Sequence, residues 1–153
     1  MKLPCLIAAL LLTLPAGGES SPCDLLLKNP DKKDFGGADF AGCALLQRRV
    51  LELDAKNSKW RGARLAHSTI RGGSFSEADF SGAHFSNVTF AHTDLSRVKF
   101  RAAFFYNVTF VQTKLAGAEF KDAVLINCKF KDSPRDESSG LPMEDDIHAA
   151  FPK

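Results

Sequence analysis

The stretch SFSEADFSGAHFSNVTFAHTDLSRVKF, residues Ser74 to Phe100, places a large apolar residue at every fifth position. These residues are Phe75, Phe80, Phe85, Phe90, Leu95 and Phe100. An α-helix has about 3.6 residues per turn and a strand alternates every two, so neither keeps a five-residue repeat on one face. The period therefore predicts a backbone that changes direction after every five residues.

The same frame extends well beyond the quoted stretch. The large apolar residues continue on multiples of five from Phe35 to Phe130, and Ala55 is the only weak one. The residue two positions earlier is usually small, as Ala78 is before Phe80. Because residues two apart in an extended chain share a face, each unit offers one large and one small inward side chain. A fixed repeat of this kind is typical of a solenoid.

The motifs ADFSG (78–82), TDLSR (93–97) and AEFKD (118–122) resemble the pattern A(D/N)LXX of the pentapeptide-repeat family. The resemblance covers residues 35–130. It implies an all-β fold: a right-handed quadrilateral parallel β-helix with four pentads per coil and about five coils. Residue n then stacks under residue n+20.

The sequence supports this 20-residue stacking. An outward column would alternate in charge, which stabilises neighbouring strands: Asp39, Lys59, Asp79, Lys99 and Glu119. An inward column would be aromatic throughout: Phe40, Trp60, Phe80, Phe100 and Phe120. We therefore expect a filled core without a ligand cavity, in which the aromatic columns are structural.

The N-terminal residues 1–18 have the three parts of a secretory signal peptide: Lys2, an apolar run over 3–16, and the small residues Ala16-Gly17-Gly18. An uncleaved membrane anchor is the alternative, but it needs about 20 apolar residues. We expect export with cleavage, no transmembrane segment in the mature chain, and a secreted or periplasmic location or an organelle lumen.

Both open ends of a β-helix expose unpaired backbone and need covers. Residues 19–34 are expected to form an N-terminal cap with a short helix starting at Pro22. Residues 131–153 form an acidic tail, for which a second short helix is predicted from an amphipathic stripe: Met143, Ile147, Ala150 and Phe151.

Residues 45–58, LLQRRVLELDAKNS, keep the five-residue frame but not its chemistry, because Arg48 takes a position that should point inward. An unpaired buried charge is costly. We therefore predict a distorted coil or a short helix near 46–57.

Three cysteines remain beyond the predicted signal peptide. Cys43 and Cys128 would lie four strand spacings, about 19 Å, apart, too far for a disulfide, whose Cα atoms lie within about 7 Å. Cys23 with Cys43 is the candidate disulfide, which leaves Cys128 as a buried free thiol. The alternative is that all three cysteines are reduced.

No catalytic, cofactor-binding or metal-binding residues are predicted. The four histidines show no metal-ligand spacing, and no nucleophile, phosphate-loop or zinc motif occurs. We therefore expect a protein that is not an enzyme and needs no cofactor.

The charge balance excludes the best-known activity of the resembled family, inhibition of type II topoisomerases by DNA mimicry. Duplex DNA carries about one negative charge per 1.7 Å, whereas residues 35–130 hold 13 basic and 8 acidic side chains. No nucleic-acid partner is expected.

One outward cluster is apolar: Phe104, Tyr106, Val124 and Ile126. Stacking would place Phe104 beside Val124 and Tyr106 beside Ile126. Exposed apolar patches mark contacts, and Tyr and Phe are favoured interface residues. The cluster predicts binding of an unknown protein or of a second copy, as a homodimer through the C-terminal coils. Alternatively, the tail covers it through Ile147 and Phe151.

The leading hypothesis is an exported, non-enzymatic scaffold for protein–protein interaction or self-association. The alternative is binding of anionic surfaces, lipid or glycan, through a mildly basic wall: Lys59, Arg61, Lys99, Arg101 and Lys121.

Overall fold

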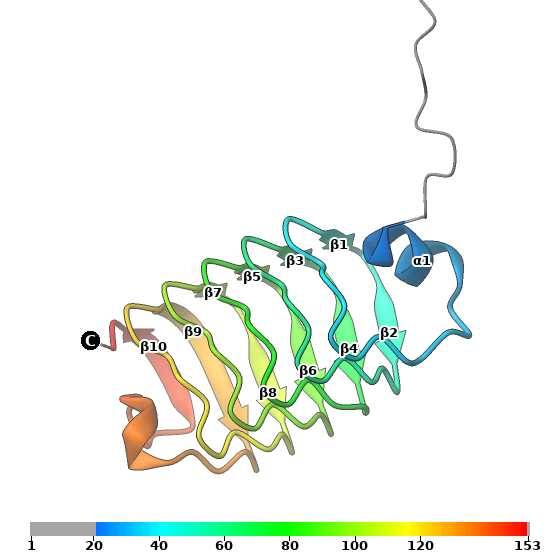
Figure 1. Ribbon diagram of the computed structural model, residues 1–153. Coiled ribbons are helices and arrows are strands. Elements are labelled where there is room, and N and C mark those ends of the chain that lie inside the picture. The colour runs from blue at the N-terminus through cyan, green and yellow to red at the C-terminus, as the bar shows by residue number, and fades with distance from the viewer. Residues whose placement is uncertain (1–20, 153) are drawn as a thin grey trace, which may run out of the picture.

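The computed structural model describes residues 21–152, so the predicted signal peptide lies outside the described residues. A short helix stands at one end of a parallel β-solenoid (Figure 1). The elements are α1 (Pro22–Lys28), β1 (Ala44–Leu46), β2 (Arg49–Leu51), β3 (Arg64–Ala66), β4 (Thr69–Arg71), β5 (His84–Ser86), β6 (Thr89–Ala91), β7 (Phe104–Tyr106), β8 (Thr109–Val111), β9 (Val124–Lys131), the 3-10 turn η1 (Glu137–Ser139) and β10 (Asp146–Ala150).

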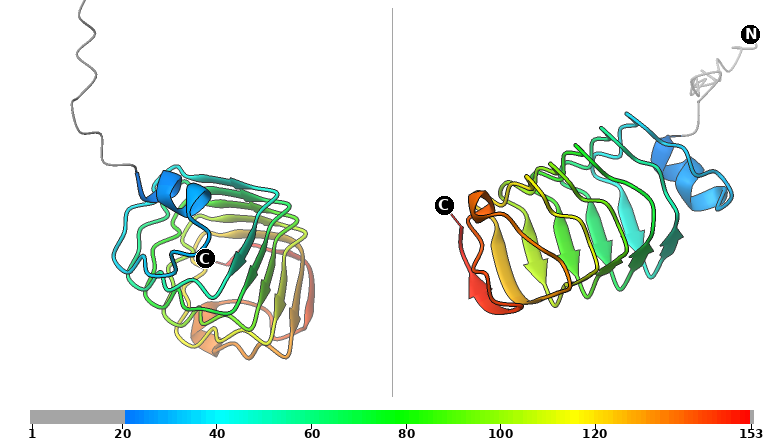
Figure 2. Two further views of the ribbon diagram at one scale, coloured as in Figure 1. Left: turned by 90° about the vertical axis from the view of Figure 1, so that its right-hand side faces the viewer. Right: turned by 90° about the horizontal axis from the view of Figure 1, so that it is seen from below.

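The strands stack in parallel with a 20-residue register, as the sequence predicts. On one face β1, β3, β5, β7 and β9 follow one another, and on the adjacent face β2, β4, β6, β8 and β9 do so. Leu45 pairs with Leu65, for example. Isolated bridges with the same spacing join the other two faces, such as Asp34 with Asp54 and Asp39 with Lys59. The four-sided coil is therefore confirmed, and Figure 2 shows its turns stacked along one axis.

Aromatic rings fill the interior in columns. Phe80 lies 5.4 Å from Trp60 and 5.6 Å from Phe100, ring centre to ring centre, and both pairs are stacked. On the next face Phe110 stacks between Phe90 and Phe130 at 5.3 and 4.6 Å. All of these rings are fully buried. Burial of this much aromatic area is the main stabilising contribution to the coil.

The predicted N-terminal helix is present as α1, and Pro22 is its first residue. The Ser21 hydroxyl caps it by accepting a hydrogen bond of 3.1 Å from the Asp24 N–H. Its leucines pack on the core of the first coil. A disulfide joins Cys23 of the helix to Cys43 of that coil, with 5.8 Å between the Cα atoms.

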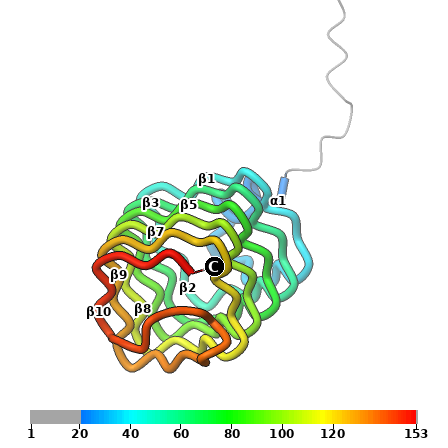
Figure 3. Tube along the Cα trace, turned by 90° about the vertical axis from the view of Figure 1, so that its left-hand side faces the viewer, coloured from blue at the N-terminus to red at the C-terminus, as the bar shows by residue number. Residues whose placement is uncertain are grey.

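No helix forms over the predicted amphipathic stripe of residues 143–151, so that prediction is wrong; within residues 131–152 the structure describes one helical turn, η1. The tail instead forms β10, which runs antiparallel to β9, with Ile147 opposite Cys128 and Ala150 opposite Leu125. An edge strand leaves a row of N–H and C=O groups unpaired, and β10 satisfies those of β9. Figure 3 shows the red tail crossing this end of the solenoid.

The apparent helical spacing of the tail has a simple origin. β9 turns a corner at Asn127, whose φ is 52°, and β10 follows β9 past that corner. Ile147 and Ala150 therefore both point into the core although they are three residues apart. A strand that bends in this way buries the same positions as one turn of a helix.

The distortion predicted near residues 46–57 is also wrong. β2 pairs in register with β4, and Val50 lies opposite Ile70. The Arg48 N–H donates a hydrogen bond of 3.0 Å to the Ser68 hydroxyl of the next coil. The Arg48 side chain is exposed, because this first coil has no further coil beneath it.

Candidate functional site

The structure brings the predicted apolar patch together on β7 and β9. Phe104 pairs with Val124 and Tyr106 pairs with Ile126. Tyr106 is 43% exposed, and the other three side chains are half-buried. We call these four residues the apolar patch.

The tail extends the sheet at the edge of the apolar patch. β10 places Ala149 opposite Ile126, so the patch adjoins the end of the chain. Ile147, one of the two residues that could have covered the patch, points into the core, and Phe151 is 65% exposed. Tyr106 remains accessible in this arrangement.

A ladder of asparagine side chains borders the apolar patch. The Asn107 amide, next to Tyr106 in sequence, donates a hydrogen bond of 3.1 Å to the Asn87 side-chain oxygen. The Asn127 amide donates in turn to Asn107. Because each amide is held by its neighbour, the polar border beside the apolar patch is fixed in place.

The predicted basic wall is interleaved with carboxylates. Arg61 forms an ion pair of 2.6 Å with Asp79, and Arg101 forms one of 2.6 Å with Glu119. Bridges also place Lys99 between Asp79 and Glu119. Both arginines of the wall are thus paired with acids, and the wall presents no continuous cationic surface.

Two outward carboxylates, Asp79 and Asp94, have lowered pKa values. Burial by itself raises the pKa of Asp79, but hydrogen bonds from Ser81 and Arg61 outweigh it and lower the pKa below the usual value. The pKa of Asp94 is also lowered, because hydrogen bonds from Ser96 outweigh the effect of burial. Both groups are ionised and structural rather than poised for proton transfer.

Within residues 21–152 no cluster of histidine, cysteine and acidic side chains could hold a metal ion. Over the same residues, no helix is long and apolar enough to cross a membrane. The free thiol of Cys128 is buried, and burial raises its pKa to about 11. It is protonated at neutral pH and therefore a poor nucleophile.

Arg135 was not predicted as a structural residue, although it organises the C-terminal end. Its guanidinium lies 4.1 Å from the centre of the Phe130 ring and donates hydrogen bonds to the carbonyls of Pro142 and Glu144, at 3.0 and 2.8 Å. Burial lowers its pKa. Arg135 thereby covers the end of the Phe130 column and holds the tail across it. The only signal for this role in the sequence was its position shortly after Phe130, the last large apolar residue of the repeats.

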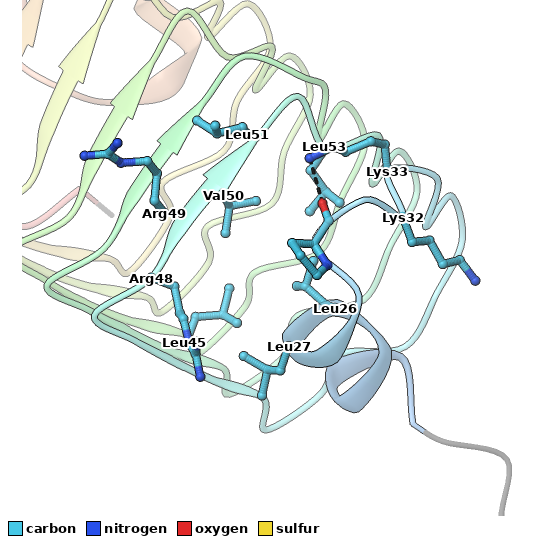
Figure 4. Close-up of a pocket in the computed structure, with 11 residues that line it drawn as sticks. Leu26, Leu27, Lys32, Lys33, Leu45, Arg48, Arg49, Val50, Leu51 and Leu53 are labelled. Atoms are coloured by element: carbon cyan, nitrogen blue, oxygen red, sulfur yellow. Dashed lines mark hydrogen bonds between the residues drawn. The ribbon is translucent and has the colours of Figure 1, made fainter.

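A cavity of about 170 Å³ lies at the opposite end, between α1 and β2. Its walls include Leu26, Leu27, Val50 and Leu53 (Figure 4). The sequence predicted a filled interior, and the coils are filled; the cavity forms where the seven-residue helix α1 covers only part of the first coil. Two features of the sequence signalled the cavity. Arg48 takes an inward position, and Val50 is smaller than the phenylalanines that occupy the same column in later coils.

The comparisons with known proteins agree with this architecture. Residues 71–139 match the family described as pentapeptide repeat region, and residues 54–87 match the one described as pentapeptide repeats (8 copies). The chain belongs to the pentapeptide repeat family. A comparison with curated proteins found no match.

Solved structures with the same fold include HetL, described as a pentapeptide repeat protein involved in heterocyst differentiation regulation, from the cyanobacterium Nostoc sp. strain PCC 7120. Its TM-score is 0.66 at 21% identity, and the match covers 75% of this chain and 49% of HetL, so the chain spans about half the length of HetL. A pentapeptide repeat protein from the cyanobacterium Cyanothece 51142 matches at 18% identity over 69% of this chain and 68% of its own, with a TM-score of 0.43. At this identity the likeness to HetL shows the fold alone.

Proposed function

We propose that this protein is an exported, non-enzymatic scaffold whose apolar patch binds another protein. The observation that carries the proposal is the exposure of Tyr106 beside Ile126 on a sheet face that the tail leaves open. Aromatic side chains of this kind are enriched in the centres of interfaces. Export is inferred from the signal-like residues 1–18.

The apolar patch is too small to form a stable protein–protein interface by itself. Its four side chains lie on two neighbouring strands, which are about 4.8 Å apart, whereas a stable interface buries about 800 Å² on each partner. The apolar patch is therefore the anchor of a larger contact that includes its polar border. By itself it supports only weak association.

The double substitution Phe104→Asp/Tyr106→Asp tests this proposal. Both side chains point outward, so the fold is kept and the apolar anchor becomes charged. The matched control is Thr109→Asp/Val111→Asp, which adds the same charge at the same level of the solenoid on the adjacent face. Thermal unfolding of each variant establishes that it is folded.

Self-association is measured first by light scattering and sedimentation, because these need no knowledge of a partner. A protein that the unsubstituted chain retains from a native non-cytosolic fraction is then identified, purified and titrated against all three chains. We expect the dissociation constant to rise at least about tenfold for the patch variant and less than about twofold for the control. Equal binding by all three chains would refute the assignment of the apolar patch.

A further inference from the structure

The cavity between α1 and β2 combines an apolar floor with basic margins. Leucine side chains from α1 face those of the first coil across it, and Val50 forms part of its floor. Val50 is 7% exposed, whereas Phe90, Phe110 and Phe130 further along the same column are fully buried. The end of the core is thus left open to a small apolar group.

Four of the eleven residues that line the cavity are basic, and none of the eleven is acidic. Figure 4 shows Arg48 and Lys33 at opposite margins of the cavity, while Arg49 and Lys32 point away from it. The Lys33 ammonium is held at its margin by a hydrogen bond of 2.8 Å to the Pro30 carbonyl. The cavity therefore selects against cations and favours a negative group at its mouth.

Arg48 is the unusual residue of this site. The positions that stack above it in later coils are all small and buried: Ser68, Val88, Val108 and Cys128. The exposed Arg48 side chain lies at the margin of the cavity, beside Leu45. It makes no ion pair with any residue that the structure describes, so its charge is available to a ligand beside an apolar surface.

We propose that this cavity binds a small anionic amphiphile, in which a short alkyl chain lies between α1 and β2 and an acidic head group meets Arg48. A dry cavity of about 150 Å³ is large enough for benzene, so the cavity holds about six carbon atoms and a longer chain extends through its mouth. A carboxylate accepts paired hydrogen bonds from a guanidinium, which fixes the orientation of the head. The site lies at the opposite end of the solenoid from the apolar patch and does not depend on it.

The ligand class is tested by calorimetric titration of the full chain with octanoate, 1-octanol and octylammonium. These probes share one alkyl chain and differ in the charge of the head. We expect octanoate to bind at least about tenfold more tightly than 1-octanol, since hydrogen bonds to charged groups are the stronger ones, and octylammonium not to bind. Equal affinity for octanoate and 1-octanol would overturn the proposal.

Three variants locate the site. Arg48→Gln removes the charge at the mouth and is expected to weaken octanoate binding about tenfold. The matched control Arg64→Gln, at an exposed arginine of the next coil that does not line the cavity, should change it less than about twofold. Val50→Phe fills the cavity with the side chain that this column carries later, and it should block the alkyl chain without loss of thermal stability. Equal effects of Arg48→Gln and Arg64→Gln, or unchanged binding by a folded Val50→Phe chain, would each show that the site is elsewhere.

Phosphatidylglycerol vesicles distinguish a free amphiphile from a membrane lipid. Octanoate binding without vesicles, together with no sedimentation of the protein with them, supports the proposal. Sedimentation with the vesicles, combined with no binding of octanoate, would overturn it in favour of a membrane surface.

Discussion

At the scale of single residues, the corners of the coil decide where each side chain points. Two positions after each large inward side chain, the backbone has a positive φ and lies in the left-handed region. Fourteen of these residues are not glycine, with φ between 48° and 61°. Such a residue costs about 1–2 kcal/mol. The corner is held because its N–H bonds the next coil, as that of Asn87 does to the Tyr106 carbonyl at 2.9 Å. The five-residue period predicts the inward side chains. The left-handed corners are signalled in the sequence only where they carry glycine, asparagine or aspartate, since others carry Gln, Glu, His, Arg or Ala.

Two glycines separate the cost of backbone strain from the cost of a clash. Gly82 has φ of 67° with open space around an added Cβ, so Gly82→Ala should lose only about 1–2 kcal/mol. Gly73 has φ of 75°, and an added Cβ would lie 2.1 Å from the Leu53 carbonyl oxygen. Gly73→Ala must also push two coils apart, for a total loss of about 2–5 kcal/mol. Urea unfolding measures both values, and equal losses would contradict this account of the clash.

At the scale of elements, the repeats and the N-terminal helix were predictable from the sequence, whereas the C-terminal strand was not. The helix α1 has local signals in Ser21 and Pro22, because capping acts within a few residues of the chain. The strand β10 has no such signal, since it forms only where the free edge of β9 is already in place. The distorted coil predicted at Arg48 is wrong for the same reason. The free energy cost of burying the Arg48 charge depends on whether a coil lies beneath it. The apolar patch was predictable from the register, whereas the cavity depends on how far α1 reaches across the first coil.

The disulfide makes the N-terminal cap a testable element. Cys23 and Cys43 are 20 residues apart, and closing a loop of this length stabilises a fold by about 3 kcal/mol. The double substitution Cys23→Ala/Cys43→Ala should therefore lower the free energy of unfolding by about that amount. Hydrogen exchange should show that the amides of α1 lose protection first, while those of β5 and β7 keep theirs.

Reduction of the disulfide provides the control. The unsubstituted chain in a reductant should unfold at the same urea concentration as the double variant. The Cys128 thiol, whose pKa is raised by burial to about 11, does not exchange with the disulfide at neutral pH. If the oxidised chain and the double variant were equally stable, the disulfide would contribute nothing to the cap.

At the scale of the whole molecule, each coil contacts only its neighbours, so the solenoid has two different ends joined by a uniform middle. The C-terminal end is closed by a paired strand and by Arg135 over Phe130. The N-terminal end is covered only in part and holds the cavity. Along the middle, outward charges alternate in sign from coil to coil and join the coils by ion pairs. The two candidate binding surfaces therefore lie towards the two ends of the solenoid.

The outward carboxylates of the middle predict how the solenoid responds to acid. The pKa values of Asp79 and Asp94 are lower in the folded chain than the usual 3.8. A carboxyl with a depressed pKa binds its proton more readily in the unfolded chain, so its stabilising effect is full above about pH 4 and is lost as the pH falls through the folded pKa. Asp79→Asn removes the Asp79 share of this dependence, at a cost of less than about 1 kcal/mol at pH 7, because Arg61, its partner, is well exposed to solvent.

Urea unfolding at pH 7 and at pH 3 measures the loss of stability in acid. We expect a smaller loss for Asp79→Asn than for the unsubstituted chain. Arg61→Gln should reduce the loss for the same reason, and the double variant should show less than the sum of the two effects, because the two side chains act as one pair. An unchanged acid dependence in Asp79→Asn would mean that the Arg61–Asp79 pair does not help to join neighbouring coils, which the backbone hydrogen bonds and the aromatic columns would then hold together.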